Sequence, residues 1–309
     1  EPRRSGRGRV WYSAGMRFSM AFVLLAGAAF GQVGLQERIR GIAGDAHGKV
    51  SVACALPGSA VNCDLDAHAH PPMQSVFKVP LALTALHLVE EGKFSLDQPI
   101  RFLPSDRILP HTHSPIQDKY PEANVDIPLR ELLRLSVSLS DNVAADIVLR
   151  TIGGPAIVDA YIESIGVKGF HLEDDEEGLA RDVRAQYRNW FEPAGAVALL
   201  RRISDDSPLT PEHTRILLGW MEETSTGPHQ IKGELPAGTI VAHKTGSSGT
   251  GSDGIAYATN DIGLITLPDG RRLAIAIFVT DSTADGATRD AVIARIAKAA
   301  YDECVRAEK

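Results

Sequence analysis

Cysteine, aromatic residues and positive charge are all scarce in this sequence of 309 residues. It has 3 Cys, 6% aromatic residues and a formal net charge of -7. So few cysteines exclude a small disulfide scaffold, and a hydrophobic share of 44% excludes a disordered or collagen-like chain. Because non-specific nucleic-acid binding needs a basic surface, the acidic balance also excludes nucleic acid as a partner.

Long hydrophobic runs are lacking as well. The apolar run at 20–30 is too short to span a bilayer, and it follows five arginines and precedes small residues. This pattern is typical of a secretory signal peptide. We therefore predict a signal peptide and N-terminal extension at 1–31 and a periplasmic or secreted, monomeric chain with no stable membrane insertion after cleavage. A retained membrane anchor is the alternative.

Two of the three cysteines flank a predicted turn at Gly58-Ser59. Counting outward from that turn places Cys54 opposite Cys63. In an oxidising compartment this pair can form a cross-strand disulfide, although some strand pairs have unsuitable Cα separations. Two packed thiols are an equally good interpretation.

Strand patterns lie at both ends of the mature chain, and helical patterns lie in the middle. The predicted strands are 49–56 and 61–67, joined as a hairpin, then 239–243, 255–267 and 272–280. The predicted helices are 36–43, 79–91, 129–135, 142–151, 156–165, 193–203, 211–222 and 288–306. Because isolated strand pairs are only marginally stable, the strands of both ends should share one sheet.

This order predicts an α/β (α+β) fold in which an antiparallel sheet, flanked by helices and formed from both chain ends, carries an inserted all-helical lobe. We expect a single catalytic domain at 32–309. Its α/β lobe spans about 33–74 and 223–309, and its helical lobe about 75–222. Two long connections, 102–128 and 170–190, interrupt the helical middle, and such loops are often functional.

Three short motifs occur in order: Ser75-Val76-Phe77-Lys78, Ser140-Asp141-Asn142 and Lys244-Thr245-Gly246. The first spacing puts the Lys78 amine one helical turn from the Ser75 hydroxyl, which describes an activated nucleophile. The Ser75 amide at the helix start can also face an oxyanion. Alone, each motif has an ordinary interpretation: an unremarkable serine with a solvated lysine, a helix cap, or a charged edge strand.

The second and third motifs supply the remaining chemistry in the functional interpretation. Ser140 transfers a proton toward a leaving nitrogen, and Asn142 hydrogen-bonds a substrate amide. Lys244 supplies charge, and Gly246 lets a ligand approach the backbone. Ser247 offers both an amide and a hydroxyl.

Together the three motifs resemble those of class A serine β-lactamases and penicillin-binding proteins. Further stretches across 33–309, including GKFSLDQPI, LPHTHSPIQDKYPE and AQYRNW, are similar to a minority branch of class A that includes extended-spectrum enzymes. The resemblance implies a β-lactamase/DD-peptidase-like fold with the pocket between its lobes. It implies a resistance enzyme that hydrolyses penicillin- or cephalosporin-type β-lactams without a cofactor. Ser75 would attack the lactam carbonyl, and the amides of Ser75 and Ser247 would form the oxyanion hole.

The same resemblance assigns a second base. Family members carry Glu-x-x-Leu in the acidic loop, and in this loop only Glu176 has a leucine three residues later, Leu179. Glu176 would polarise the water that attacks the acyl-enzyme, while Lys78, Glu176 or both activate Ser75. A solvated acidic surface is the alternative for this loop.

Several positions depart from the wider family. Ala180 stands where Asn usually helps to hold the water, so the resemblance does not transfer the water's placement. Asp146 and Asn189 differ from the commoner Asn and Asp, as in the minority branch. Gln230 replaces an expected Arg and leaves the substrate carboxylate four partners: Ser140, Lys244, Thr245 and Ser247. We expect weaker carboxylate binding with the chemistry retained.

Two other functions compete with hydrolysis. A DD-peptidase acting on peptidoglycan peptides would use the same serine and lysines, but the Glu176 loop argues against it. A non-hydrolysing penicillin-binding sensor or acyl-trap would acylate without turnover. The pairs His68/His70 and His111/His113 could bind metal, but neither has a convincing third ligand, so we predict no metal site.

Overall fold

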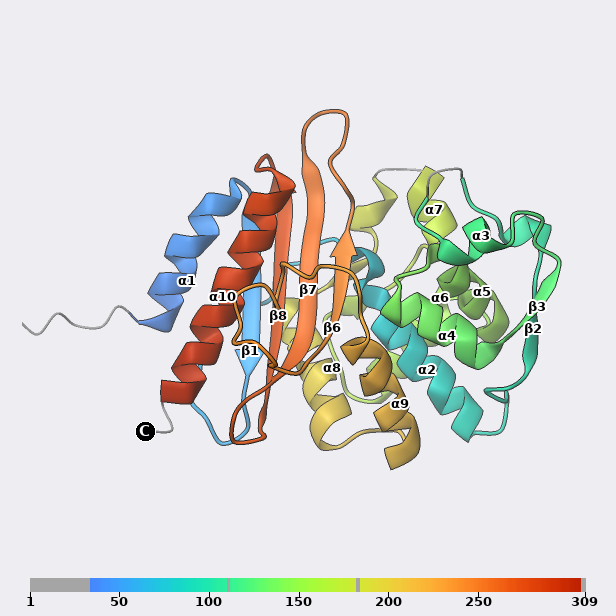
Figure 1. The fold of residues 1–309 in the computed structure, drawn as a ribbon, viewed down its shortest axis with the longest axis horizontal. Helices are drawn as coiled ribbons and strands as arrows, with labels where there is room; N and C mark the ends of the chain where they lie inside the picture. Colours follow the sequence, from blue (N-terminus) through green and yellow to red (C-terminus); the bar gives the residue numbers. More distant parts are fainter. Residues whose placement is uncertain (1–33, 110–111, 182–183, 307–309) are drawn as a thin grey trace, which may run out of the picture. The chain divides into compact units, whose positions relative to one another are not determined.

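The computed structural model describes residues 34–109, 112–181 and 184–306 (Figure 1). Residues Val33–Lys309 form one structural unit. The export signal predicted at 1–31 lies outside the described residues. Within the described ranges, no helix is both long enough and apolar enough to cross a membrane.

A four-stranded antiparallel sheet combines the two ends of the chain. Strand β1 (Lys49–Ala55) pairs with β8 (Arg272–Ser282), β8 with β7 (Ala256–Thr266), and β7 with β6 (Val241–Ser247). The predicted antiparallel sheet shared by both ends is confirmed. The order β1-β8-β7-β6 leaves β6 at the edge that faces the inserted helices.

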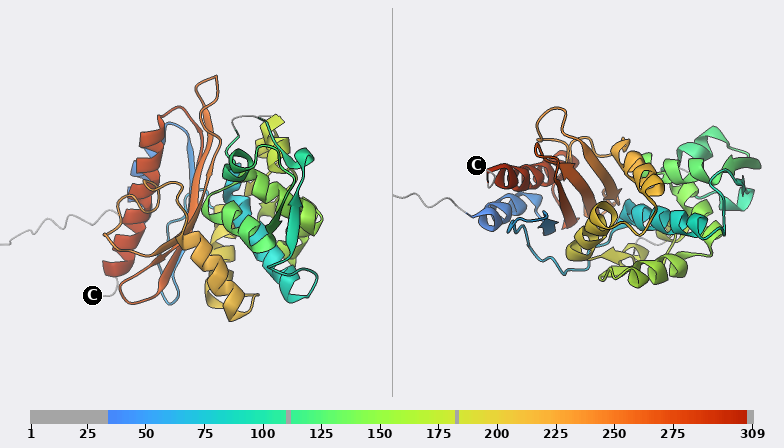
Figure 2. Two further views of the ribbon diagram at one scale, coloured as in Figure 1. Left: turned by 45° about the vertical axis from the view of Figure 1, so that its right-hand side comes forward. Right: turned by 90° about the horizontal axis from the view of Figure 1, so that it is seen from below.

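Helices cover both faces of the sheet. Successive side chains of a buried strand point to opposite faces, so each strand contributes to two hydrophobic cores. Ile275 and Ile277 of β8 pack with α1 (Leu35–Ala43) and α10 (Gly286–Arg306). Ala276 and Phe278 belong to the core on the opposite face. Figure 2 shows α1 and α10 together on one side of the sheet and the remaining helices on the other.

The inserted lobe is organised around α2 (Lys78–Glu90). Every residue from 78 to 86 is buried, so this helix runs through the lobe's interior instead of along its surface. The surrounding helices are α3 (Pro115–Lys119), α4 (Leu129–Ser138), α5 (Asn142–Ile152), α6 (Pro155–Ser164), α7 (Glu176–Arg181) and α9 (Pro211–Glu222). The predicted helices are all present, with ends that either coincide with the prediction or differ from it by at most three residues.

The inserted lobe is helical in the main, as predicted, but differs from the prediction in two respects. The lobe contains two small sheets, β2 (Pro99–Phe102) with β3 (Val125–Pro128), and β4 (Phe170–His171) with β5 (Trp190–Phe191). They tie the ends of the two long connections together. In addition, α8 (Pro193–Asp205) packs against β1 and β8 and so belongs to the sheet's second layer.

The predicted hairpin was also partly wrong. Residues 61–67 form no strand, and their backbone pairs with β1 at a single bridge between Val52 and Leu65. The Ser59 hydroxyl and the Asn62 side chain accept hydrogen bonds from nearby backbone amides, which competes with strand pairing. The pairing register is nevertheless the one expected, and Cys54 and Cys63 form a disulfide with a Cα–Cα distance of 5.4 Å.

Candidate active site

Ser75 lies in a turn of 3-10 helix, Gln74–Phe77, that leads directly into α2. Gln74 has a φ of 48°, a left-handed backbone that turns the chain sharply into this helix. Lys78 is one turn further on, and its Nζ donates a hydrogen bond of 3.0 Å to Ser75 Oγ. The contact expected from the Ser-x-x-Lys spacing is therefore present.

The Lys78 ammonium is fully buried and surrounded by oxygens. Besides Ser75 Oγ, its Nζ lies 2.9 Å from the Ser140 carbonyl, 2.6 Å from Asn142 Oδ1 and 2.8 Å from Glu176 Oε1. A lysine ammonium has three N–H donors, and all of them have acceptors here. The Glu176 carboxylate supplies a full opposite charge, which stabilises the charged lysine in a dry environment.

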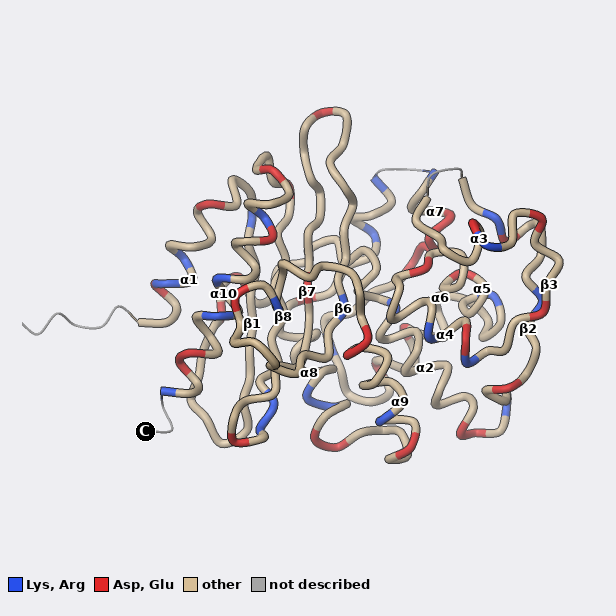
Figure 3. Tube along the Cα trace, in the orientation of Figure 1, with Lys and Arg blue, Asp and Glu red and all other residues tan. Residues whose placement is uncertain are grey.

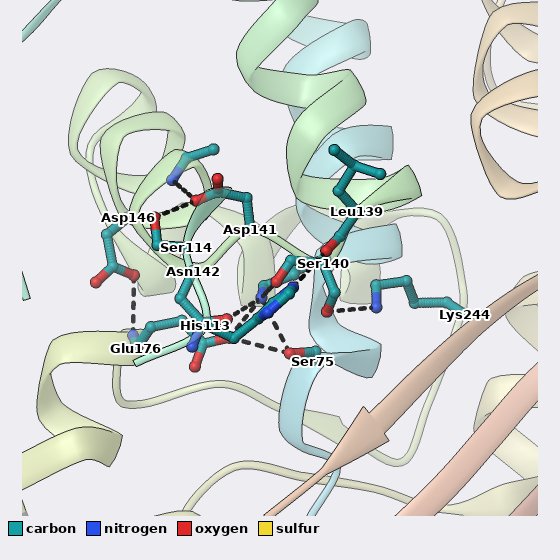
Figure 4. A network of polar contacts seen from close by, with 12 residues as sticks. Ser75, His113, Ser114, Leu139, Ser140, Asp141, Asn142, Asp146, Glu176 and Lys244 are labelled. Carbon is teal, nitrogen blue, oxygen red and sulfur yellow. Dashed lines mark hydrogen bonds and ion pairs between the residues drawn. The ribbon is translucent and has the colours of Figure 1, made fainter. Parts of the chain in front are cut away.

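Glu176 begins α7 and reaches Ser75 from the side opposite the sheet. Its Oε1 accepts a hydrogen bond of 3.2 Å from Ser75 Oγ. Figure 4 shows Asp146 above it, where the two carboxylate oxygens accept the backbone N–H groups of Glu176 and Glu177, each at 2.9 Å. Burial, together with the nearby carboxylates of Glu176 and Asp175, raises the pKa of Asp146 well above its ordinary value.

Asn189 holds the other end of the same loop. Its Oδ1 accepts the amides of Glu173 and Asp174, and its Nδ2 donates to the Asp174 carbonyl at 2.8 Å. The two positions that depart from the wider family, Asp146 and Asn189, are thus the side chains that fix the loop carrying Glu176.

Ser140 and Lys244 meet across the junction of the helical lobe and the sheet. Lys244 Nζ donates to Ser140 Oγ at 2.8 Å and to the Thr245 carbonyl at 2.9 Å. Both acceptors are neutral, and Lys244 is fully buried. Burial and the nearby positive charge of Lys78 hold the pKa of Lys244 well below its ordinary value.

The middle residue of Ser140-Asp141-Asn142 has a different task from its neighbours. Asp141 caps α5 by accepting the Ala144 amide at 3.0 Å, and it also accepts from the Ser114 hydroxyl. Ser140 has a φ of 56°, which turns its side chain away from the cap and toward Lys244. The capping interpretation therefore holds for Asp141, while the flanking Ser140 and Asn142 contact the two lysines.

Lys244-Thr245-Gly246 lies inside β6, which continues beyond the predicted strand 239–243 as far as Ser247. A Cβ at Gly246 would lie 2.5 Å from the Met73 carbonyl oxygen. The close approach that requires glycine here is thus made by the chain's own backbone before Ser75. This packing brings the end of β6, where Ser247 is exposed, next to the turn that carries Ser75.

The predicted residues surround one pocket of about 280 Å³, and an adjoining cleft of about 360 Å³ shares several of them. The pocket is lined by Ser75, Ser140, Asn142, Glu176, Thr245 and Ser247. Lys78 and Lys244 lie buried behind it, while Ala180 lines the adjoining cleft.

Sequence reasoning missed some lining residues. Gln74, Thr226 and Gly227 also line the pocket, and Thr226 Oγ1 is 2.6 Å from Thr245 Oγ1. The sequence signal for Thr226 and Gly227 was the run Ser225-Thr226-Gly227, a small polar turn that follows the predicted helix 211–222. No cluster of three metal-ligating side chains occurs within the described ranges, and His111 lies outside them.

A sequence model described as the Beta-lactamase enzyme family matches residues 34–304. The chain belongs to this family. It is 40% identical to the extended-spectrum β-lactamase PER-1 of Pseudomonas aeruginosa over 86% of each chain, and 37% identical to β-lactamase VEB-1 of the same organism, over 75% of this chain and 78% of VEB-1.

Solved structures agree with this assignment. A β-lactamase from Chitinophaga pinensis superimposes with a TM-score of 0.84 at 44% identity, covering 87% of this chain and 99% of that one. The TLA-1 extended-spectrum β-lactamase gives the same TM-score at 40% identity, with 88% and 98% covered. The expected resemblance to class A enzymes, and to the branch with extended-spectrum members, is confirmed.

Proposed function

We propose that this enzyme hydrolyses the β-lactam ring of penicillin- and cephalosporin-type antibiotics through an acyl-serine formed at Ser75. The observation that carries the proposal is the contact of one hydroxyl with two buried groups of opposite charge. Ser75 Oγ lies 3.0 Å from Lys78 Nζ and 3.2 Å from Glu176 Oε1. A nucleophile needs a nearby group that accepts its proton, and this hydroxyl has one.

In the acylation step, Ser75 Oγ attacks the lactam carbonyl carbon and passes its proton to Glu176. The Lys78 ammonium, whose protons are directed at oxygens, lowers the energy of the developing alkoxide. The amides of Ser75 and Ser247 hold the resulting oxyanion. The close packing of Gly246 on the Met73 carbonyl supports this pairing because it sets the two segments side by side.

Cleavage of the ring C–N bond requires a proton on the leaving nitrogen. Ser140 is suited to supply it, because its Oγ accepts a hydrogen bond from Lys244 Nζ and its own O–H is then left to donate. Lys244 can restore that proton because its charged form is already disfavoured by burial. Asn142 and Thr245 orient the substrate through its side-chain amide and its carboxylate.

Deacylation requires a water molecule to attack the ester. Before that attack, Glu176 releases to solvent the proton that it took from Ser75, and Lys244 regains one from solvent. Glu176, the buried carboxylate nearest Ser75, then accepts a proton from the attacking water and passes it to Ser75 Oγ as the C–O bond breaks. We propose that the enzyme acts in the periplasm or outside the cell. The Cys54–Cys63 disulfide supports that location, because such bonds persist in oxidising compartments.

The test combines turnover with mass measurement. The chain from residue 32 is mixed with excess chromogenic cephalosporin, and product per protein molecule is followed. We expect many turnovers, abolished by Ser75→Ala. A burst of one equivalent with a persistent adduct would instead indicate an acyl-trap or a DD-peptidase, which cleavage of a D-alanyl-D-alanine peptide distinguishes. Absence of both burst and adduct would refute the proposal.

A further inference from the structure

Gln230 lies where β6, the loop before it and α10 meet. Its side chain is 6% exposed, yet the residue lines the pocket together with Thr226, Gly227 and Thr245. The Gln230 amide thus adjoins the part of the pocket formed by the β6 hydroxyls. A primary amide presents a hydrogen-bond donor or an acceptor depending on how it is turned, so its orientation decides what this wall recognises.

Asp290 of α10 fixes that orientation. Gln230 Nε2 donates a hydrogen bond of 2.9 Å to Asp290 Oδ1. The turned amide would bring its oxygen against a carboxylate oxygen and lose this charge-assisted bond. Gln230 Oε1 is consequently directed away from α10, and it is buried without a hydrogen-bond partner in the described part of the chain.

The unpartnered oxygen lies beside the pocket wall. A Cβ at Gly227 would be 2.8 Å from Gln230 Oε1, so the oxygen lies against Gly227, which lines the pocket; the same Cβ would be 2.5 Å from Thr245 Cγ2 on the neighbouring strand. A buried acceptor without a partner is unfavourable, and it becomes more so next to another acceptor. A substrate carboxylate at Thr245 and Ser247 would be such a neighbour, whereas a neutral or hydrogen-bond-donating group would not.

We infer that Asp290 is a positioning residue for substrate specificity. By holding Gln230 with its oxygen toward the pocket, it lowers the preference for lactams that carry a free carboxylate relative to their neutral counterparts. This inference rests on the proposed hydrolysis and concerns KM, because the amide does not touch Ser75 or Glu176.

The test compares one cephalosporin with its neutral methyl ester in four proteins: wild type, Asp290→Asn, Gln230→Leu and the double variant. In Asp290→Asn the glutamine amide is free to turn its N–H groups toward the pocket. We expect KM for the acid to fall roughly five- to tenfold, since a hydrogen bond to a charged group replaces a repulsion. The kcat for both substrates and KM for the ester should change less than twofold.

The double variant separates positioning from a structural effect. If Asp290 acts through Gln230, Asp290→Asn in the Gln230→Leu background leaves the acid-to-ester ratio of KM unchanged. A ratio that shifts equally in both backgrounds, or does not shift in either, overturns the inference. Asp290→Ala, with the same expected shift, replaces Asp290→Asn if that variant fails to fold. Wild-type protein that hydrolyses neither substrate would refute the proposed function itself.

Discussion

The two lysines behind the pocket are equally buried but differ in their partners. Lys78 lies 2.8 Å from the Glu176 carboxylate, whereas Lys244 donates to a hydroxyl and a carbonyl. Figure 3 shows few charged positions along β6, the strand that contains Lys244, and several acidic positions at α7, the helix that begins with Glu176. Burial alone disfavours an ammonium, so the presence of a carboxylate decides whether the charge is stabilised.

This difference divides the chemistry between the two sides of the pocket. The Lys78 side keeps separated charges next to the nucleophile, as required for repeated proton transfer with Ser75. The Lys244 side holds a lysine whose proton is easily lost, next to the hydroxyl that must protonate the leaving nitrogen.

Replacing Lys78 by methionine should have the largest effect. The change leaves the Glu176 carboxylate buried without its cation, which destabilises a protein by about 3–5 kcal/mol. The loss of the group that assists Ser75 should lower kcat/KM by roughly 10³-fold. Urea unfolding and steady-state kinetics measure the two effects. A variant with wild-type stability would contradict the account of the Lys78–Glu176 pair.

Lys244→Met is the matched control, because it removes an equally buried lysine without leaving a hydrogen-bonded carboxylate unpaired. The free energy of unfolding should stay the same or rise, since a methionine of similar length avoids burying a charge. Activity should still fall roughly 10²-fold, because Ser140 loses the donor that directs its proton. A loss of stability as large as that of Lys78→Met would contradict the claim that only Lys78 is stabilised by a buried carboxylate.

The pH dependence of stability sharpens the same point. The folded-state pKa of Lys244 lies below the ordinary value of 10.5, so the unfolded chain binds more protons between these two values. Stability attributable to Lys244 therefore rises as pH rises through that window toward 10.5. Relative to Lys244→Met, wild type should gain stability between neutral and alkaline pH in urea unfolding. If the stability of wild type relative to Lys244→Met stayed constant or fell as the pH rose, the lowered pKa assigned to Lys244 would be contradicted.

Gln230→Arg should have the smallest effect. It adds a cation near Thr245, where Lys244 is the one cationic residue among the four partners predicted for the substrate carboxylate. We expect KM for carboxylate-bearing lactams to fall a few-fold and kcat to remain the same. Unchanged catalytic efficiency toward all such lactams would count against the role given to Gln230. Gln230→Leu, measured in parallel, controls for the loss of the amide.

Local sequence patterns predicted much of the site. The contact of Ser75 with Lys78 follows from spacing within one helical turn, and the Asp141 cap follows from its place before an apolar helix. The shared sheet followed from strand patterns at both ends of the chain. The contact and the cap each depend on residues that are near one another in sequence. The sheet was predictable because each strand has its own pattern of apolar residues.

Features that depend on distant partners were not predictable in this way. Nothing local indicates that Asp290 fixes the Gln230 amide, because the two residues are 60 positions apart. Residues 61–67 have the composition of a strand, yet local side-chain hydrogen bonds leave them a single bridge to β1. The role of Gly246 in packing on Met73 likewise required the position of both segments in space.

The most direct test of the division of labour is to trap the acyl-enzyme in Glu176→Gln. The variant keeps the Ser140–Lys244 pair but lacks the carboxylate that we assign to water activation. Lys78, buried and no longer paired with an anion, then takes the Ser75 proton in place of Glu176, so acylation continues while hydrolysis stops. After mixing with a cephalosporin, intact mass and peptide mapping should show one stable adduct on Ser75, with turnover reduced by a factor of roughly 10² or more. Full turnover without an adduct would contradict the assignment of Glu176 as the base for hydrolysis.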